Sequence, residues 1–418
     1  MSEQRPSPRQ PVGAAGPLGP STRAVRAASR VPPVRQTPTS VPIYQTATFS
    51  SADGEELAAV LSGEQPGYAY SRIDNPTSGA LGDAVADLHG AEAGIALATG
   101  MAAIHAALLS VLRGGDRILI GRVGYGTTRT QVRSAFERLG VRVDEVDTTD
   151  TAAVGRALAD TPARVLHVET IANPTCVVAD LPALAEAAHR AGALLTVDNT
   201  FASPAICRPL DHGADLVIES ATKYLSGHSD VMAGAVVGGR ERIRAVRAAQ
   251  IDTGATLAPL SAFLVLRGIA TLPVRMERQT RTALALAAFF EGAPGVARVI
   301  YPGLPSHPQA DVAHRILDAG GAMLAVELAG GREAGRIVFD TLRIPERTAS
   351  LGSVHTMVVH PPSSSHRALT GEQLAAAGIT EGLLRISVGL EDEADLLADF
   401  GAALAAAESS AAPAGQAR

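Results

Sequence analysis

The chain has 418 residues, of which 46% are hydrophobic and 19% charged, and its formal net charge is −6. This composition supplies enough apolar material for a large core and excludes a wholly disordered chain, while the acidic balance gives no electrostatic basis for binding nucleic acid. The two cysteines, Cys176 and Cys207, cannot staple a fold of this size, and their spacing matches no metal motif.

The N-terminal region is crowded with Pro, Arg, Ser and Gly and has no continuous apolar segment of the kind that marks a secretory signal. We assign residues 1–60 to a proline-rich, partly disordered arm, and residues 408–418 to a disordered tail of similar composition. No apolar run approaches the roughly 18–20 residues that a membrane-spanning helix needs. We therefore expect a cytoplasmic protein with neither a membrane nor a nucleic-acid partner.

Between residues 61 and 255, short β-like runs alternate with helical segments. The predicted strands are 95–98, 117–120, 141–143, 164–168, 194–197 and 216–218, and the clearest predicted helices are 101–112 and 181–191. Near-continuous apolar strands separated by helices are typical of a mostly parallel sheet that is covered on both faces. In such α/β sheets, ligands bind beyond the carboxyl ends of the strands.

A long helical region over residues 259–291 follows, and the pattern then changes. Strands at 323–328 and 384–387 and helices at 333–341 and 393–406 predict a smaller α+β domain, which we place at residues 256–407.

The strongest chemical signal is the run Ser220-Ala221-Thr222-Lys223-Tyr224, directly after a predicted strand. A lysine there, with hydroxyls one and three positions before it, fits a Schiff-base lysine whose neighbours bind a phosphate. The plainer interpretation is a solvated surface lysine.

Asp198 ends the preceding predicted strand, where a carboxylate could pair with a protonated pyridine nitrogen, although alone it could equally cap a turn. Gly100, between a strand and a helix, would let a phosphate approach the free N–H groups of the helix. One glycine before a helix is weak evidence by itself. Because adjacent parallel strands bring Asp198 and Lys223 to one rim of the sheet, the signals together predict a pyridoxal phosphate site.

Two segments carry a family resemblance: Ser220 to Gly234, reading SATKYLSGHSDVMAG, and Asp198 to Pro204, reading DNTFASP. They resemble the Cys/Met-metabolism family of pyridoxal-phosphate enzymes, which includes cystathionine γ-synthase, cystathionine γ- and β-lyases, methionine γ-lyase and O-acetylhomoserine sulfhydrylase. Further matches lie at Tyr70-Ser71-Arg72, Asn75-Pro76-Thr77, Tyr125-Gly126, Asn173-Pro174, Ser350-Leu351-Gly352 and Arg385 to Asp392. The resemblance covers about residues 42 to 406 and implies an α/β PLP-dependent transferase fold (aspartate-aminotransferase-like, fold type I).

The resemblance also implies roles for single residues. Lys223 would carry the cofactor, Asp198 would pair with its ring nitrogen, and Tyr125 would stack on the ring and donate a proton to the leaving group. The phosphate would be bound by Gly100, Met101, Ser220 and Thr222, and by Tyr70 and Arg72 of a neighbouring subunit. Arg385 would bind the substrate α-carboxylate, with Asn173 and Ser350 close by. Active sites shared in this way imply a dimer at least, and a homotetramer built from such dimers.

The histidines carry weaker signals. We interpret His228 as a hydrogen-bonded scaffold residue, and we place His355 and His360 close to the substrate pocket without a contact to substrate.

The departures from the family pattern narrow the reaction. The chain has no tryptophan, which disfavours β-elimination of cystathionine, and Ala349 stands before the Ser350 motif where enzymes that handle cystathionine by γ chemistry have a glutamate. Thr127, His355, Gln279 and Glu219 also depart from the residues usual at their positions, and we expect them to cluster around the pocket.

We therefore predict a carbon–sulfur lyase that performs γ-elimination on an L-homoserine-type or sulfur amino acid. The alternatives are γ-replacement, as in cystathionine γ-synthase or O-acetylhomoserine sulfhydrylase, and γ-elimination from an unusual γ-substituted amino acid. An aminotransferase and a cofactor-binding scaffold without catalysis are disfavoured, because family-specific segments and the residues needed for chemistry are all present.

Overall fold

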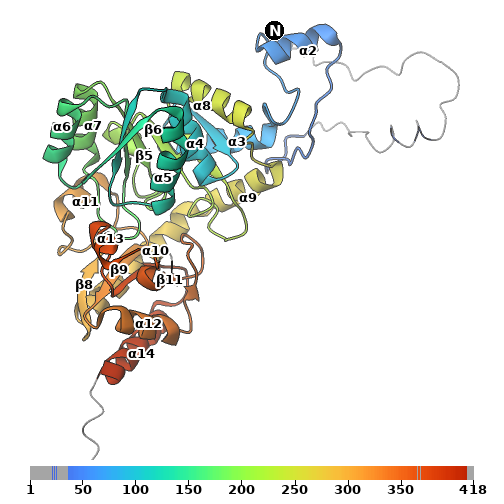
Figure 1. Ribbon diagram of the computed structural model, residues 1–418. Coiled ribbons are helices and arrows are strands. Elements are labelled where there is room, and N and C mark those ends of the chain that lie inside the picture. The colour runs from blue at the N-terminus through green and yellow to red at the C-terminus, as the bar shows by residue number, and fades with distance from the viewer. Residues whose placement is uncertain are drawn as a thin grey trace, which may run out of the picture.

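The computed structural model describes residues 21, 23, 25, 36–364, 366, 367 and 369–411. Most of the predicted N-terminal arm and residues 412–418 of the predicted tail lie outside the described residues. Within the described part, two sheets of seven and five strands each form the centre of a layered unit, and the larger unit comes first in the chain (Figure 1).

The larger sheet has the strand order β1-β7-β6-β5-β4-β2-β3. Its strands are β1 (Ala93–Leu97), β2 (Arg117–Gly121), β3 (Arg142–Val146), β4 (Val165–Glu169), β5 (Leu194–Asp198), β6 (Leu216–Glu219) and β7 (Gly234–Gly238). The five strands from β6 to β3 are parallel, and β7 runs antiparallel between β6 and β1. The predicted mostly parallel sheet is confirmed, with β7 as a strand that the sequence patterns did not indicate.

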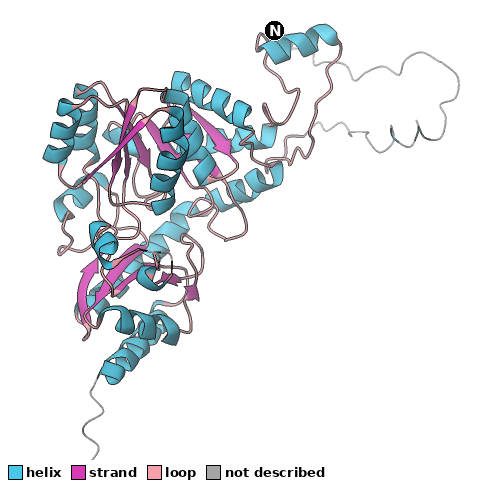
Figure 2. Ribbon diagram, viewed as in Figure 1, coloured by secondary structure: helices cyan, strands magenta, loops and turns pink. Residues whose placement is uncertain are grey.

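Both faces of this sheet are buried, as continuous apolar strands predict. In β2, Leu119 packs into one hydrophobic cluster while its neighbours Ile118 and Ile120 pack into another on the opposite face. The flanking helices are α3 (Pro76–His89), α4 (Gly100–Val111), α5 (Gly126–Gln131), α6 (Thr151–Asp160), α7 (Leu181–Arg190) and α8 (Arg240–Thr253). Helices α6 and α7 cover one face and α4 and α8 the other, so the sheet is the middle layer of three (Figure 2).

The predicted helical region over residues 259–291 consists of two helices, α9 (Pro259–Ile269) and α10 (Leu272–Glu291), bent by 59°. The buried Arg275 stabilises the break, because its guanidinium donates to the carbonyl of Gly268 (2.8 Å) and to the hydroxyl of Thr271 (3.0 Å). Pro273 lies in the first turn of α10, where a missing N–H costs no helical hydrogen bond. Among the described helices, none is long and apolar enough on its own to cross a membrane, and only the bent pair α9–α10 meets that criterion jointly.

The smaller sheet has the order β10-β11-β12-β9-β8 and is mostly antiparallel. Its strands are β8 (Val296–Ile300), β9 (Met323–Leu328), β10 (Glu346–Arg347), β11 (Met357–Val359) and β12 (Leu383–Ser387), and its helices are α11 (Ala310–Ile316), α12 (Gly331–Thr341), α13 (Gly371–Ala376) and α14 (Glu393–Ala411). Helices α10, α12 and α14 pack on this sheet around a second core. The predicted α+β unit is therefore confirmed, and α14 extends to Ala411, beyond the helix end at residue 406 and the domain end at residue 407 that the sequence predicts.

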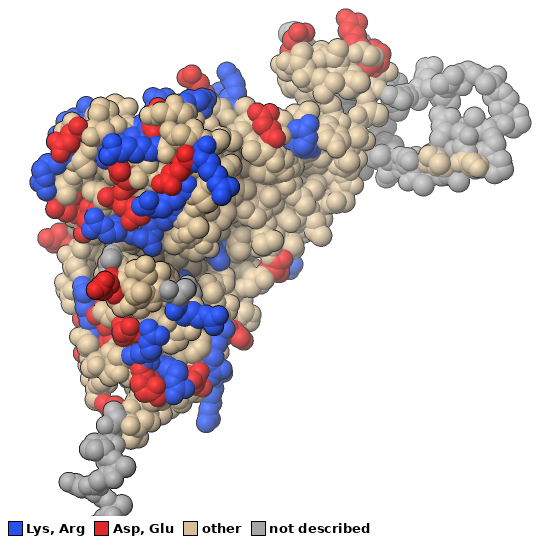
Figure 3. All heavy atoms as spheres, viewed as in Figure 1, with Lys and Arg blue, Asp and Glu red and all other residues tan. Residues whose placement is uncertain are grey.

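Helix α2 (Gly54–Ser62) stands away from the body of the molecule (Figure 1). The side chain of Asp53 caps its N-terminus, but none of its residues is buried. On the face shown in Figure 3, acidic and basic side chains are interspersed over the body, whereas the surface leading toward α2 is largely uncharged. Helix α2 therefore lacks a packing partner within the described part of the chain.

Candidate active site

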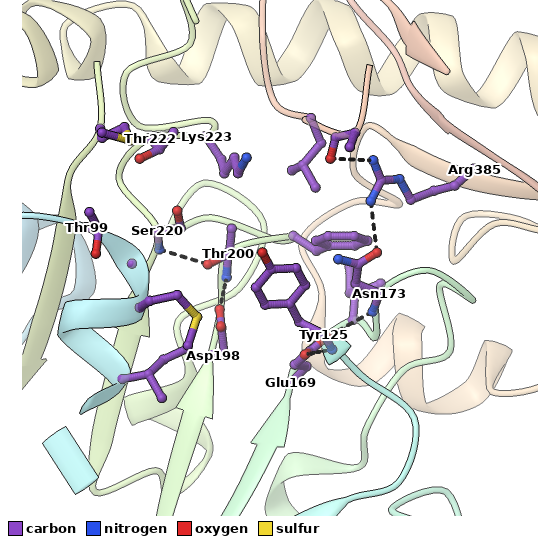
Figure 4. A pocket seen from close by; sticks show the side chains of 18 residues that line it. Thr99, Tyr125, Glu169, Asn173, Asp198, Thr200, Ser220, Thr222, Lys223 and Arg385 are labelled. Atoms are coloured by element: carbon purple, nitrogen blue, oxygen red, sulfur yellow. Dashed lines mark hydrogen bonds between the residues drawn. The ribbon is translucent and has the colours of Figure 1, made fainter. Parts of the chain in front are cut away.

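A cavity of about 220 Å³ lies between the two units, at the carboxyl ends of β4, β5 and β6 (Figure 4). The N-terminus of α4 closes one side, and residues before β11 and on β12 close the other. Residues that line it include Thr99, Gly100, Met101, Tyr125, Glu169, Asn173, Asp198, Thr200, Ser220, Thr222, Lys223, Ala349 and Arg385. Side chains far apart in the sequence are thus gathered at the sheet edge where α/β folds bind ligands.

Lys223 reaches into this cavity from the turn after β6, and its Nζ donates to the Ser350 hydroxyl at 2.8 Å. Burial, assisted by the positive charge of Arg385, lowers the pKa of Lys223 to about 8. A lowered pKa makes the neutral, nucleophilic amine accessible near physiological pH. Lys223 is also the only lysine in the chain, a signal that the surrounding motif alone did not reveal.

Two carboxylates lie side by side beneath the cavity, because Asp198 and Glu169 are paired positions of β5 and β4. The backbone N–H of Thr200 donates to Asp198 Oδ1 at 3.0 Å. Burial raises the pKa of Asp198, and it raises the pKa of Glu169 with help from the charge of Asp198. The sequence interpretation missed Glu169, although the strand-end argument that selected Asp198 applies to it equally.

A cradle lies between the N-terminus of α4 and the turn after β6. The Thr99 hydroxyl caps α4 by accepting from the N–H of Ala102 at 3.0 Å. A Cβ at Gly100 would lie 2.7 Å from the Cβ of Ser220, so only glycine leaves this space open. The Thr222 hydroxyl bonds to the N–H and C=O of Ala233 at 2.9 and 3.1 Å. The free N–H groups and positive dipole of α4 suit a phosphate in this cradle.

Arg385 on β12 is a buried cation, with 5% of its surface exposed. Its guanidinium donates to Asn173 Oδ1 (2.9 Å) and to the carbonyl of Ser350 (2.8 Å), while its Nε has no partner. In the part of the chain that the structure describes, no carboxylate forms an ion pair with it. Burial lowers the pKa of Arg385 to about 10, which leaves it charged at neutral pH. A buried guanidinium of this kind fits an incoming carboxylate.

Tyr70 and Arg72 do not line this cavity. Arg72 donates to the carbonyl of Ile251 at 2.8 Å and lies over the ring of Tyr70, whose surface is 44% exposed. Both residues are therefore separate from the other predicted phosphate-binding residues of their own chain.

The departures from the family pattern do not cluster around the cavity as we expected. Ala349 lines it, but Thr127, His355, Gln279 and Glu219 do not. Thr127 and His355 are exposed, whereas Gln279 is buried and donates to the carbonyl of Ser353 at 2.6 Å. Of these departures, only Ala349 is therefore placed to contact a molecule in the cavity.

The histidines have structural partners. His228 Nδ1 donates to the carbonyl of Ser226 at 2.6 Å, in agreement with a scaffold role. His360 is buried and bonds to the carbonyl of Glu381 at 2.9 Å. Neither His355 nor His360 lines the cavity.

The arrangement fits pyridoxal 5'-phosphate. A partly buried amine, a buried carboxylate and a cradle at a helix N-terminus correspond to the aldehyde, the ring nitrogen and the phosphate of that molecule. The cavity also holds a phenol at Tyr125 and a carboxylate-binding guanidinium at Arg385, which together suit an amino-acid substrate.

Comparisons with known proteins agree with this chemistry. The family model described as "Cys/Met metabolism PLP-dependent enzyme" matches residues 21–405. The chain is 45% identical over 368 residues to L-methionine gamma-lyase of Pseudomonas putida, covering 87% of this chain and 92% of that protein. It is 40% identical to O-succinylhomoserine sulfhydrylase of Pseudomonas aeruginosa, covering 92% of this chain and 95% of that protein.

Solved structures show the same fold. The crystal structure of cystathionine gamma synthase from Xanthomonas oryzae in complex with aminoacrylate and cysteine matches with a TM-score of 0.84 and 38% identity, covering 94% of this chain and all of that one. A putative O-acetylhomoserine (thiol)-lyase from Campylobacter jejuni also matches with a TM-score of 0.84, at 29% identity over 88% of this chain and 95% of that one. That structure contains N'-pyridoxyl-lysine-5'-monophosphate.

Proposed function

The chain belongs to the Cys/Met-metabolism family of pyridoxal-phosphate-dependent enzymes, and we propose that it catalyses γ-elimination from an L-homoserine-type or sulfur amino acid. Substrate and water are converted to a 2-oxo acid, ammonia and the protonated γ-group; methionine, for example, would give 2-oxobutanoate, ammonia and methanethiol. The enzyme depends on pyridoxal 5'-phosphate.

The residues that would hold the cofactor are those of the cavity. Lys223 would bind it covalently, Asp198 would hold the ring nitrogen protonated, and Tyr125 would cover the ring. The cradle of Gly100, Met101, Ser220 and Thr222 would receive its phosphate. When bound, the cofactor supplies an electron sink for the negative charge that proton removal leaves on the substrate carbons.

The chain's own groups then have distinct tasks. Arg385 binds the α-carboxylate and so fixes the substrate's orientation. The Nζ of Lys223 takes the proton from Cα, and its lowered pKa suits this work as a general base. The Ser350 hydroxyl, which accepts from that Nζ at 2.8 Å, orients the amine, and the phenol of Tyr125 gives a proton to the departing γ-group.

Ala349 is the observation that favours elimination. It lines the cavity beside the carbonyl of Ser350, so this side of the pocket offers a methyl group where a glutamate would bind a distal ammonium. A pocket without that carboxylate suits a small, uncharged γ-substituent. The 45% identity to a methionine γ-lyase points to the same reaction.

The second candidate is γ-replacement, which the 40% identity to an O-succinylhomoserine sulfhydrylase supports. It begins with the same proton removals, and it differs in that a thiol adds at Cγ, so the product keeps its amino group and no ammonia is released. Incubating the holoenzyme with methionine, homocysteine, cystathionine and O-acyl-homoserines, with and without added cysteine, separates the two. Release of 2-oxobutanoate and ammonia without thiol supports elimination, whereas thioether formation only with thiol would favour replacement.

The assembly that suits this chemistry is a homotetramer built from dimers with shared active sites. Tyr70 and Arg72 lie outside their own chain's cavity, which supports their serving a neighbouring copy. Helix α2 has no buried residue and carries exposed Leu57 and Leu61, and the chain segments before and after it carry exposed Ile43, Tyr44 and Tyr68. Burial of such side chains between copies would stabilise an oligomer.

A further inference from the structure

Glu169, the last residue of β4, has a carboxylate that the proposed reaction does not use. Each of its oxygens accepts one backbone hydrogen bond: Oε1 from the N–H of Tyr125 at 2.5 Å and Oε2 from the N–H of Asn173 at 2.9 Å (Figure 4). Both donors belong to residues whose side chains line the active site. One side chain thus ties together two loops that follow different strands.

Asn173 connects Glu169 to Arg385, the residue that we propose binds the substrate carboxylate. Asn173 Oδ1 accepts from the guanidinium of Arg385 at 2.9 Å, so the position of the Asn173 backbone helps to set where that guanidinium lies. On the other side, Tyr125 precedes α5 and no side chain caps that helix. The hydrogen bond from the Tyr125 N–H to Glu169 therefore holds the backbone of Tyr125 in place.

Close packing keeps this arrangement in place. Gly124 precedes the tyrosine, and a Cβ at that position would lie 2.8 Å from Glu169 Oε1. Real Cβ atoms essentially never approach so closely, so a side chain here would displace the carboxylate. Glycine at residue 124 therefore lets the loop meet Glu169 without displacing the carboxylate.

We propose that Glu169 is a positioning residue, which sets the phenol of Tyr125 and, through Asn173, the guanidinium of Arg385 relative to the substrate. This inference rests on the proposed function for the roles of those two side chains. Glu169 itself touches the backbone of both loops, and its effect on the reaction passes through them.

Glu169→Gln tests the inference with nearly unchanged volume. An amide has one acceptor oxygen, so its NH₂ group would face one of the two backbone N–H donors, and one hydrogen bond is lost. We expect kcat/KM to fall by roughly 10- to 100-fold, since the loss of a buried hydrogen bond loosens the loops that carry Tyr125 and Asn173. The two N–H groups that then face each other repel and shift the side chain against both loops, so KM should rise because Arg385 is displaced and kcat should fall because Tyr125 is displaced.

Two background variants show through which side chain Glu169→Gln changes KM and through which it changes kcat. Asn173→Ala keeps the backbone N–H but removes the acceptor for Arg385, and Tyr125→Phe keeps the backbone N–H but removes the phenol. In the first background the effect of Glu169→Gln on KM should disappear, and in the second its effect on kcat should disappear. Fully additive losses in both backgrounds would overturn the proposal.

Two measurements are independent of turnover. Amide hydrogen exchange of holoenzyme peptides that contain residues 125 and 173 should become faster in Glu169→Gln. The dissociation constant of L-norvaline, which keeps the α-carboxylate but has no leaving group, should rise severalfold when it is read from the cofactor absorbance. If wild type releases no 2-oxo acid while these two changes occur, the proposed function fails and the positioning role stands.

Two further variants guard against a misfolded product. Gly124→Ala leaves Glu169 in the chain but displaces its carboxylate, and should shift KM, kcat and exchange in the same directions. Glu327→Gln, on β9, removes another partly buried carboxyl whose pKa is raised by burial, and should change none of these quantities. Unchanged amide exchange and norvaline binding in both Glu169→Gln and Gly124→Ala would show that Glu169 has no positioning role.

Discussion

The ε-amine of Lys223 donates a 2.8 Å hydrogen bond to the hydroxyl of Ser350, and this contact joins the two units at the proposed reacting atom. Lys223 follows β6 of the larger sheet, whereas Ser350 lies between β10 and β11 of the smaller one. Gly352, with φ of +73°, packs so closely that a Cβ there would lie 2.8 Å from the backbone N of Tyr224. The direction of the amine therefore depends on how the units pack against each other.

The reactivity of Lys223 should follow an unusual pH profile. In the apoenzyme, acetylation of its amine by trace acetic anhydride should rise with pH and level off with a midpoint near pH 8, since burial and the charge of Arg385 lower the pKa to about 8. Arg385→Gln removes that charge, so the midpoint should move upward. Mass spectrometry of the Lys223 peptide measures both profiles. A midpoint near that of a free lysine in the unmodified apoenzyme would contradict the burial argument.

Gly100→Ala should weaken cofactor binding. The new Cβ would lie 2.7 Å from the Cβ of Ser220, whose backbone N–H donates to the Thr200 hydroxyl at 2.8 Å and limits its movement. Overpacking of this kind costs about 1–3 kcal/mol, so the dissociation constant of pyridoxal 5'-phosphate should rise roughly tenfold. Gly371→Ala is the matched control, because Gly371 also begins a helix and a Cβ there meets nothing within 4 Å. Equal cofactor affinity in both variants would argue against the cradle.

Complementation between two inactive variants should reveal shared active sites. Lys223→Ala and Arg72→Ala should each have little activity alone. After the two are mixed, unfolded and refolded together, hybrid dimers would contain one site with the lysine of one copy and the arginine of the other, and activity should return. Each variant refolded alone is the control. If Arg72 served its own chain, the hybrids would stay inactive.

A buried network behind the cofactor-binding turn should contribute to stability. Glu219 Oε1 accepts from the Asn199 amide at 3.0 Å and bonds to His89 Nε2 at 3.1 Å, and Asn199 and His89 are fully buried. Glu219→Ala leaves both groups without this acceptor, at about 1–3 kcal/mol for each unsatisfied group. Urea unfolding of the apoenzyme should show a loss of roughly 3 kcal/mol in the free energy of unfolding.

The matched variants for this network are Glu219→Gln and Glu186→Ala. The first keeps an acceptor oxygen and should lose less stability than Glu219→Ala. The second removes an exposed glutamate that pairs with Arg190 on the surface of α7, and should leave the unfolding midpoint unchanged. If Glu219→Ala had the same unfolding midpoint as Glu186→Ala, the network would not contribute to stability.

Sequence patterns predicted the parts of the fold that depend on residues close together in the chain. The parallel strands are continuous apolar runs, because both of their faces are buried, and all six predicted strands of the larger sheet are present. Strand β7 was missed because it has a glycine at each end, a pattern typical of turns. The break between α9 and α10 depends on Arg275, whose bonds to Gly268 and Thr271 leave no mark on the hydrophobic period.

The sequence predicted the cavity residues that belong to recognisable motifs. The cavity gathers Lys223, Asp198, Gly100 and Arg385, as the resemblance implied. Glu169 was missed because no motif distinguishes it from other acidic residues at strand ends, and its bonds to two loop backbones depend on tertiary structure. The amide of Gln279 reaches the carbonyl of Ser353 across 74 positions of sequence, so no spacing rule places it behind the cavity wall.

Because Lys223 is the single lysine, proteolysis can measure how much of the protein carries the cofactor. An endoprotease that cuts only after lysine would split the denatured chain once, into residues 1–223 and 224–418. A side chain blocked by a borohydride-reduced cofactor would resist that cut, and the polypeptide would stay whole. The ratio of the intact band to the two fragment bands on a gel would then give the fraction of chains that had carried the cofactor.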